Sequence, residues 1–223
     1  AFGGKLVDAN NKVVIDSPET IKALEYAKEM YATFIPSTLS WLDPNNNKAF
    51  LDGQISLTNN GISIYYATKT SPDEKVRALN SDVFHAPYPV GPVGSPTESH
   101  LFFNQMVMKY TKYPNAAKEF LRFMMEKEQF DPWQTAAGGY IAPPLDAYTK
   151  GAIWTSDPKH TAYRDAVKNM RPAGYAGKLG YASAGAGADF IVVNMVAEAA
   201  SGSKTPKEAA ERAQKRAERY YKV

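Results

Sequence analysis

The feature that most constrains the fold is the segment APYPVGPVGSP, which spans residues 86–96 near the middle of the chain. It contains four prolines and two glycines. Proline lacks a backbone N–H and glycine weakens regular structure, so this segment sustains neither a helix nor an inner strand. We therefore expect a loop, or a crossing between two parts of the chain.

Helix boundaries give the clearest local signals on either side of that loop. Ser17 can cap a helix whose first position is Pro18, and apolar residues then recur at helical spacing to about Tyr31. Near the other end, Thr205 and Glu208 have the spacing of a capping box, which predicts a last helix running to about Tyr221.

Between these two helices the pattern predicts short elements of both kinds. Phe190, Val193 and Val196 should form the buried stripe of a helix that Gly202 ends. The other helices are expected at residues 47–52, 73–79, from 114 to about 124, and 157–169. Short strands are expected at residues 13–15, 55–58, 83–85, 101–103 and 105–108. The fold class is therefore predicted as α/β and rich in helix.

The segment LTNNGISIYY, residues 57–66, carries a turn signal. Asn-Gly between two strand-like runs is typical of a type I′ hairpin, in which both central residues have positive φ. Ser63 and two tyrosines follow the turn directly. Small polar and aromatic residues at such a place suit either a plain turn or the edge of a binding site.

Composition narrows the class of protein. The 223 residues are 44% hydrophobic and 22% charged, which is enough for one large or two small globular domains. Cysteine is absent, so disulfides, thiolate metal sites and cysteine nucleophiles are excluded. No apolar run is long enough to cross a membrane. Because the chain opens with Ala-Phe-Gly-Gly rather than Met, we expect its N-terminal part to have been removed or to lie in another piece.

The net charge of +3 is concentrated in the last helix. Residues 204–222 hold seven basic and three acidic side chains, which leaves the remainder of the chain near −1. A charge run on one terminal helix is usually its solvated face. We therefore expect no nucleic-acid partner.

The common catalytic and cofactor templates are not matched. The sequence has no complete dinucleotide or phosphate loop and no nucleophile elbow. His85, His100 and His160 are far apart and lack metal-ligand spacing. We expect no catalytic residue, no metal site and no cofactor. One alternative stays open, a polysaccharide hydrolase or lyase in which acids such as Asp43, Asp52 or Glu98 meet in the cleft.

Aromatic residues beside glycine- and proline-rich loops are the strongest sign of binding. A flat ring can cover the C–H face of a sugar while amide or hydroxyl groups bond its hydroxyls. Taken singly, Tyr66 and Phe103 fit a hydrophobic core better than a binding site, whereas Trp41, Tyr65 and Tyr140 fit both equally. The residues concerned are Trp41, Tyr65, Tyr66, Phe102, Phe103, Tyr140, Tyr175 and Tyr181.

The order of several blocks carries a resemblance to a known family. These blocks are GGKLVDANNKVVIDSPETIKALEYAKEMY, AFLDGQISLTNNG, HAPYPVGPVG, NAAKEFLRFMMEKEQF with GGYIAPPLDAY, and AASGSKTPKEAAERAQKR. Together they resemble the carbohydrate-type, maltose-binding-like solute-binding proteins of ABC importers. The resemblance covers essentially the whole chain, and it depends on the order of the blocks because no single block is highly specific.

This resemblance implies a two-lobe, type II periplasmic-binding-protein-like fold. Residues 1–97 and 146–223 would belong to the C-terminal lobe, and residues 98–145 would cross into the N-terminal lobe. Family members are much longer than this chain, so their first half would be a missing partner of it. The resemblance also implies a periplasmic location, or an extracellular lipid-anchored one in a Gram-positive bacterium, and delivery of the solute to ABC permease subunits.

The resemblance also suggests ligand contacts. Many members carry a tryptophan two residues after the Asn-Gly, where this chain has Ser63. Ser63 and Tyr65 would face the ligand, while Ile62, Ile64 and Tyr66 alternate into the lobe. The full set of implied ligand-binding residues is Trp41, Asn60, Ser63, Tyr65, His100, Phe102, Tyr140 and Tyr181.

These observations favour a non-catalytic receptor for a small polar solute, expected to be a sugar or oligosaccharide. The polysaccharide hydrolase or lyase named above is the first alternative. A helical scaffold for protein contacts is the second, and it would show no saturable binding of small molecules.

Overall fold

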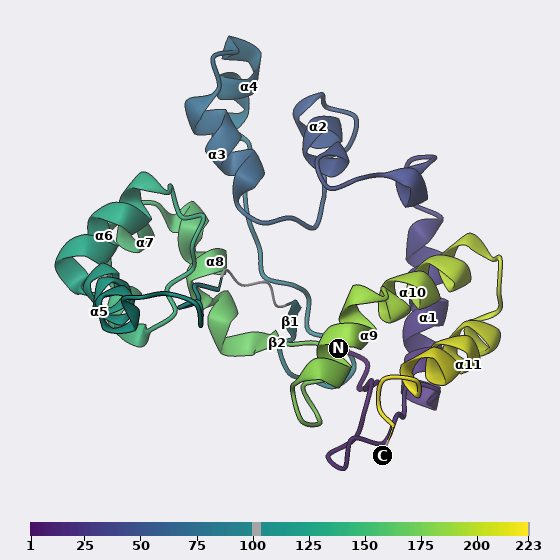
Figure 1. Ribbon diagram of the computed structural model, residues 1–223. Coiled ribbons are helices and arrows are strands. Elements are labelled where there is room, and N and C mark those ends of the chain that lie inside the picture. The colour runs from purple at the N-terminus through teal and green to yellow at the C-terminus, as the bar shows by residue number, and fades with distance from the viewer. Residues whose placement is uncertain (100–103, 223) are drawn as a thin grey trace. The chain divides into compact units, whose positions relative to one another are not determined.

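The computed structural model describes residues 1–99 and 104–222, and the chain divides into two compact units. Unit 1 takes its described residues from Ala1–Trp41, Tyr88–His100 and Arg171–Val223, and unit 2 from Leu42–Pro87 and Leu101–Met170. Regular structure is almost entirely helical (Figure 1). Within the described ranges, the strands are β1 (Glu98–Ser99) and β2 (Met170–Arg171), which pair with each other.

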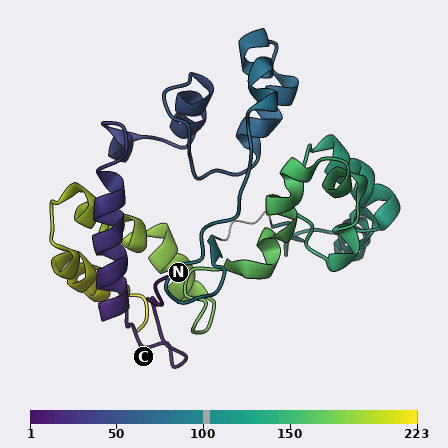
Figure 2. The same cartoon turned by 180° about the vertical axis from the view of Figure 1, so that it is seen from behind.

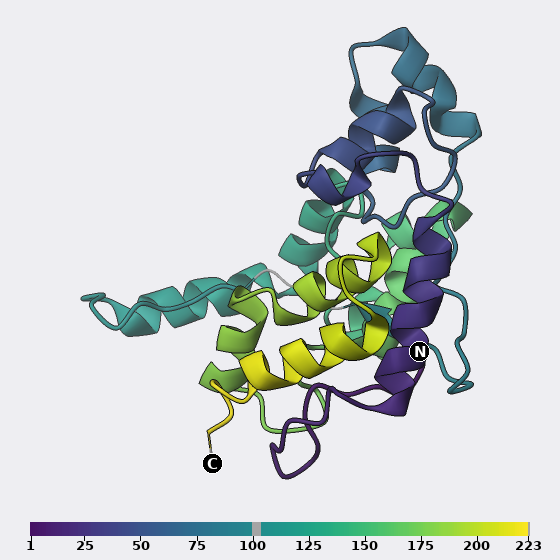
Figure 3. The ribbon, with the colours of Figure 1, turned by 90° about the vertical axis from the view of Figure 1, so that its right-hand side faces the viewer.

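Unit 1 is built on three packed helices. Helix α1 (Pro18–Tyr31) contacts both α10 (Ile191–Ser201) and α11 (Pro206–Ala217), and these two also pack on each other (Figures 1 and 3). The same helices are seen from behind in Figure 2. The other helical segments of unit 1 are the short 3-10 helix η1 (Thr38–Ser40) and α9 (Tyr181–Ala188).

The caps predicted for the terminal helices are confirmed. Ser17 Oγ accepts a hydrogen bond from the backbone N–H of Thr20 at 3.3 Å. In the last helix, the N–H of Glu208 donates to Thr205 Oγ1 at 3.2 Å, and the N–H of Thr205 donates to Glu208 Oε2 at 2.8 Å. Each bond pairs a backbone donor that the helix itself leaves free, so the boundaries follow from local chemistry.

Alanine dominates the contact surface of α11. Its buried residues are Ala209, Ala210, Ala213 and Ala217, and such small side chains let neighbouring helices approach closely. From α1, Leu24 enters the same core with 1% of its surface exposed. Burial of one such leucine stabilises the fold by roughly 1.5–3 kcal/mol.

The predicted buried stripe of α10 is wrong. Ile191, Met195 and Ala199 face the core, whereas Phe190 is 61% exposed and Val193 is also exposed. The sequence is apolar on more than one side of this helix, so periodicity alone does not identify the side that packs. The end of the helix at Gly202 is confirmed, with φ of 74°.

Unit 2 consists of shorter helices joined by long loops. The 73–79 prediction corresponds to α4 followed by a 3-10 turn, and the helix expected from Pro114 is α5. The elements in order are α2 (Asn45–Leu51), α3 (Ser63–Thr70), α4 (Glu74–Ala78), η2 (Leu79–Ser81), α5 (Pro114–Met124), α6 (Lys127–Ala136), η3 (Asp146–Tyr148), α7 (Ala152–Thr155), η4 (Pro158–His160), α8 (Thr161–Ala166) and η5 (Val167–Asn169).

Two further predictions for this unit need correction. The single helix expected at 157–169 is divided into η4, α8 and η5. Asp157 caps the start of η4 by accepting a hydrogen bond from the N–H of Lys159 at 3.0 Å, and the buried His160 ring bonds back to the carbonyl of Ile153 at 2.8 Å. The strands expected at 55–58, 83–85 and 105–108 do not form, since a strand needs a paired neighbour and none lies beside these segments in the described part of the chain.

At the N-terminus of unit 1, the strand expected at 13–15 reduces to one antiparallel bridge between Val7 and Val13. The prediction for 101–103 lies outside the described residues. The expectation of a helix-rich chain is thus confirmed, whereas the strands that an α/β class needs are mostly not formed in the ranges described.

The Pro- and Gly-rich segment 86–96 contains no helix or strand, as predicted. The boundary between the units, at Pro87 and Tyr88, lies within it. Its C-terminal part packs on the first residue of unit 1: the N–H of Val93 donates to the carbonyl of Ala1 at 3.1 Å. A Cβ at Gly91 would lie 2.7 Å from the Ala1 carbonyl oxygen, so this close approach requires glycine.

Candidate functional site

An amide–hydroxyl cluster of Asn47, Asn60 and Ser63 lies where α3 begins in unit 2. The Asn60 side-chain amide donates to Ser63 Oγ at 3.0 Å and to Asn47 Oδ1 at 2.9 Å. The Asn47 amide donates to the same serine oxygen at 2.9 Å. Asn60 and Ser63, both predicted as site residues, are therefore in direct contact, and α2 contributes a third member that the sequence analysis missed.

This cluster keeps unused hydrogen-bonding capacity. Ser63 Oγ accepts two bonds, while its O–H has no acceptor among the described residues. Asn60 Oδ1 likewise has no donor in the described part of the chain. A sugar hydroxyl both donates and accepts, so it complements a serine O–H and an amide oxygen held at one place.

Two tyrosines extend the same surface. Ser63 and Tyr66 are three residues apart on α3 and share a helix face. The Tyr66 ring meets the ring of Tyr140 edge-on, with centroids 5.2 Å apart, and Tyr140 is 46% exposed. Gly138 makes this possible, because a Cβ there would lie 2.6 Å from the Tyr66 ring. The predicted break at the double glycine thus places Tyr140 beside α3.

Tyr65 points elsewhere. It is 3% exposed, and its hydroxyl donates to Asp157 Oδ2 at 2.6 Å. Lys69 donates to the same carboxylate oxygen at 3.0 Å, and its ammonium lies 4.3 Å from the centroid of the Tyr65 ring. These contacts fix α3 to residues far along the chain, so Tyr65 anchors the helix that presents Ser63 and Tyr66.

The electrostatics of this anchor follow from burial and hydrogen bonding. Burial, reinforced by the Asp157 carboxylate, raises the pKa of Tyr65 to about 12. Burial by itself would raise the pKa of Asp157, but hydrogen bonds from Tyr65 and Lys69 outweigh it and hold that pKa well below its usual range. The phenol therefore stays protonated and the carboxylate charged over the whole neutral range.

The turn and strand predicted for this segment are wrong. The non-glycine residues with positive φ in the described ranges are Asn11, Ser37 and Phe190, and Gly61 is not among the positive-φ glycines either. A type I′ turn at Asn60-Gly61 is thus not formed. Residues 63–70 form α3, so the strand-like alternation that placed Tyr65 outward and Tyr66 inward does not apply.

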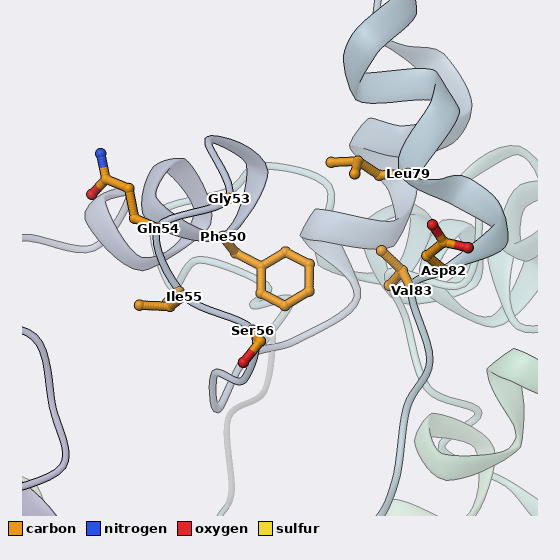
Figure 4. Close-up of a pocket in the computed structure, with 8 residues that line it drawn as sticks. All are labelled: Phe50, Gly53, Gln54, Ile55, Ser56, Leu79, Asp82 and Val83. Carbon is orange, nitrogen blue, oxygen red and sulfur yellow. The ribbon is translucent and has the colours of Figure 1, made fainter.

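A separate hollow in unit 2, here called the α2–η2 pocket, has a volume of about 410 Å³. Figure 4 shows the Phe50 ring pointing toward Leu79 and Val83, with the Asp82 carboxylate beside Val83 and Gln54 extending away. The described residues that line it are Phe50, Gly53, Gln54, Ile55, Ser56, Leu79, Asp82 and Val83. Sequence analysis did not single out this set, because its members come from two segments about 25 residues apart with no shared motif.

The remaining predicted site residues belong to unit 1 or lie outside the described residues. Trp41 is half-buried in unit 1, and Tyr181, also in unit 1, is 99% exposed at the start of α9. His100 and Phe102 lie outside the described residues.

The acids considered for hydrolysis are distributed over both units. Asp43 is exposed in unit 2, and Asp52 is paired there with Lys48. Glu98, in unit 1, is 9% exposed, and burial raises its pKa. Glu98 thus belongs to a different unit from Asp43 and Asp52, and Asp52 is engaged in an ion pair with Lys48.

His85 and His160 serve packing in unit 2. The Nδ1 atom of His85 lies 2.7 Å from the carbonyl of Lys159, and burial lowers the pKa of this histidine. Among residues 1–99 and 104–222, no group of three or more His, Cys, Asp and Glu side chains is placed to hold a metal ion. Over the same ranges, no helix combines the length and the apolar character needed to cross a membrane.

Comparison with known proteins identifies the family. Residues 1–162 match the family model of bacterial extracellular solute-binding proteins, which is more than half of the chain. The resemblance to a solute-binding family is thereby confirmed. A search of curated proteins found no match.

Proposed function

Because the chain belongs to the bacterial extracellular solute-binding proteins, we propose that it captures a small polar solute outside the cytoplasm and delivers it to an ABC permease. The proposed location is the periplasm, or the outer face of the membrane in a Gram-positive bacterium. In this role the protein binds and releases its solute unchanged, and we expect no turnover.

We propose that the solute is a sugar or oligosaccharide. The observation that carries this proposal is the amide–hydroxyl cluster beside the Tyr66–Tyr140 pair. The Ser63 O–H and Asn60 Oδ1, which have no partner among residues 1–99 and 104–222, complement sugar hydroxyls, and a tyrosine face covers the apolar C–H side of the ring. The aromatic role of the tryptophan that relatives carry at the position of Ser63 would pass to Tyr66 and Tyr140.

Further contacts would come from the other residues that the resemblance implies: Trp41, His100, Phe102 and Tyr181. Tyr65 would not contact the solute but would hold α3 in place through its hydrogen bond to Asp157. In the proposed two-lobe arrangement, residues 1–97 and 146–223 belong to one lobe and 98–145 to the other. A solute that contacts both lobes favours the closed state by its difference in affinity between closed and open states, which drives hinge closure.

A thermal-shift screen of sugars, polyols, amino acids and small acids on the complete protein tests the proposed class of solute. A ligand that binds only the folded state raises the apparent melting temperature by mass action. We expect one or more sugars to stabilise the protein, without any cleaved product in mass spectrometry. Stabilisation by amino acids or small acids alone, or the appearance of product, would contradict the proposal.

The Asn60→Ala variant tests the proposed place of binding. Loss of one neutral hydrogen bond costs about 0.5–1.5 kcal/mol, so calorimetric affinity for the identified sugar should fall by about three- to ten-fold. Asn104→Ala is the matched control, since Asn104 is exposed in the same unit and forms no hydrogen bond with a described residue. If Asn60→Ala and Asn104→Ala bound the sugar with equal affinity, the amide–hydroxyl cluster would not be part of the binding site.

A further inference from the structure

The α2–η2 pocket differs in chemistry from the amide–hydroxyl cluster, because it combines apolar walls with one carboxylate. Phe50, Leu79 and Val83 face one another across it (Figure 4). Phe50 and Leu79 are half-buried and Val83 is 4% exposed. Their aliphatic and aromatic surfaces suit an apolar body of small size, and a volume of about 410 Å³ is within the range of small-molecule sites.

Asp82 supplies the only acidic side chain of the lining. Its Oδ1 accepts a hydrogen bond from Ser81 Oγ at 3.0 Å, and it forms no ion pair with any described residue. The neighbouring cation, Lys159, is already bound by the carbonyls of Asn80 and Ser81 at 2.6 and 3.0 Å. The carboxylate thus keeps acceptor capacity that the described part of the protein does not use.

We propose that the α2–η2 pocket binds a small organic cation of the alkylammonium class, with the ammonium group at Asp82 and the alkyl groups against Phe50, Leu79 and Val83. Charge complementarity carries the choice of occupant. A carboxylate attracts a cation directly, and the face of an aromatic ring such as that of Phe50 adds a cation–π attraction. The side chains of Asp82, Gln54 and Ser56 together supply fewer oxygen ligands than the roughly six that Ca²⁺ or Mg²⁺ requires.

This site is independent of the sugar site proposed above, since the two share no residue. A protein that failed to bind any sugar could still bind the cation here, and the reverse also holds. Each proposal therefore succeeds or fails on its own ligand.

Choline and its neutral isostere 3,3-dimethyl-1-butanol provide the test, because they have nearly the same shape and differ in charge. Both are titrated into the complete protein, with binding followed by calorimetry and by ligand-observed NMR. We expect choline to bind at least about five-fold more tightly than the alcohol. Asp82→Asn should reduce choline binding to the level of the alcohol, and Phe50→Leu should weaken choline binding because it removes the aromatic face while keeping an apolar side chain.

Asp43→Asn is the matched control, because Asp43 is another exposed carboxylate of unit 2 that forms no ion pair with a described residue. It should leave choline binding unchanged. Thermal unfolding checks that each variant is folded, and the wild-type comparison of choline with the alcohol needs no variant at all. Equal binding of the two probes, no binding of either, or unchanged choline affinity in Asp82→Asn would overturn the proposal.

Discussion

The two units hold themselves together by different means. Unit 1 has a continuous apolar core, to which α1, α10 and α11 all contribute. Unit 2 has a smaller apolar cluster, and side-chain hydrogen bonds connect its segments: Gln134, for example, accepts from Trp154 Nε1 at 3.0 Å and donates to the carbonyl of Ile141 at 3.1 Å. Burial of apolar area is non-directional, whereas such hydrogen bonds fix one arrangement.

The two units therefore suit different roles: unit 1 provides stability, and unit 2 provides the candidate binding sites. Apolar burial tolerates volume-conserving changes, so unit 1 can serve as a scaffold. The amide–hydroxyl cluster and the α2–η2 pocket both lie in unit 2. Binding at such sites depends more on the orientation of polar groups than on the apolar area that is buried. Substitutions in each unit test whether the two units are stabilised in these different ways.

The largest loss of stability is expected for Leu24→Ala in unit 1. Leu24 is 1% exposed, and truncation of a buried leucine costs about 2–5 kcal/mol through lost transfer energy and the cavity left behind. Urea denaturation measures the change in the free energy of unfolding. Leu42→Ala, at a position 77% exposed, is the control and should change it little. Equal effects of the two variants would deny that unit 1 rests on its apolar core.

In unit 2 the corresponding substitution is Asp157→Asn. It weakens the bonds from Tyr65 and Lys69, and hydrogen bonds to charged groups contribute about 1.5–3 kcal/mol each. We expect a loss of about that size, detected as earlier urea unfolding and as faster amide exchange in α3. Asp165→Asn, which removes a more exposed ion pair with Arg164, should cost less. A larger effect of the control would contradict the anchoring role of Asp157.

The pH dependence of stability reports the same anchor. The pKa of Asp157 is lower in the folded state than its ordinary value near 4, so its contribution is complete above about pH 4 and is lost as the pH falls below it. The pKa of Tyr65 is raised from 10 to about 12, so its contribution is lost as the pH rises through that interval. Urea melts from pH 2 to 12 should show both limbs, and Asp157→Asn should flatten the acid one.

A smaller effect is expected for Thr205→Ala in unit 1. The variant removes the side-chain half of the capping box of α11, which costs about 1 kcal/mol. Ser95→Ala, at an exposed loop position, is the control. If the cap had no effect on the melting temperature, the boundary of α11 would be set by tertiary packing rather than by local chemistry.

Contacts between residues close in sequence could be predicted, whereas contacts between distant residues could not. The caps at Ser17 and Thr205 join residues three apart, so local patterns contain them. The bond from Tyr65 to Asp157 spans 92 residues, and no motif connects its two ends. The buried side of α10 also depended on its partners, because more than one side of that helix is apolar.

At the candidate site, Asn60 and Ser63 were predicted together, and the structure brings them into contact. The predicted orientations of Tyr65 and Tyr66 were the reverse of those observed. The prediction assumed the alternation of side chains along a strand, whereas this part of the chain is helical. The helical spacing of Ser63, Tyr66 and Thr70 in the sequence was the signal that could have corrected this. Asn47 could not have been found locally, since it reaches the site from α2.

The most direct test of the proposed sugar surface compares these two tyrosines. Calorimetry with the sugar identified in the screen is carried out on Tyr66→Ala and Tyr65→Phe. The account predicts that Tyr66→Ala lowers affinity about ten-fold or more through loss of ring contact, while Tyr65→Phe lowers the stability of the protein and leaves affinity within about two-fold of wild type. Full affinity in Tyr66→Ala together with a large loss in Tyr65→Phe would contradict it.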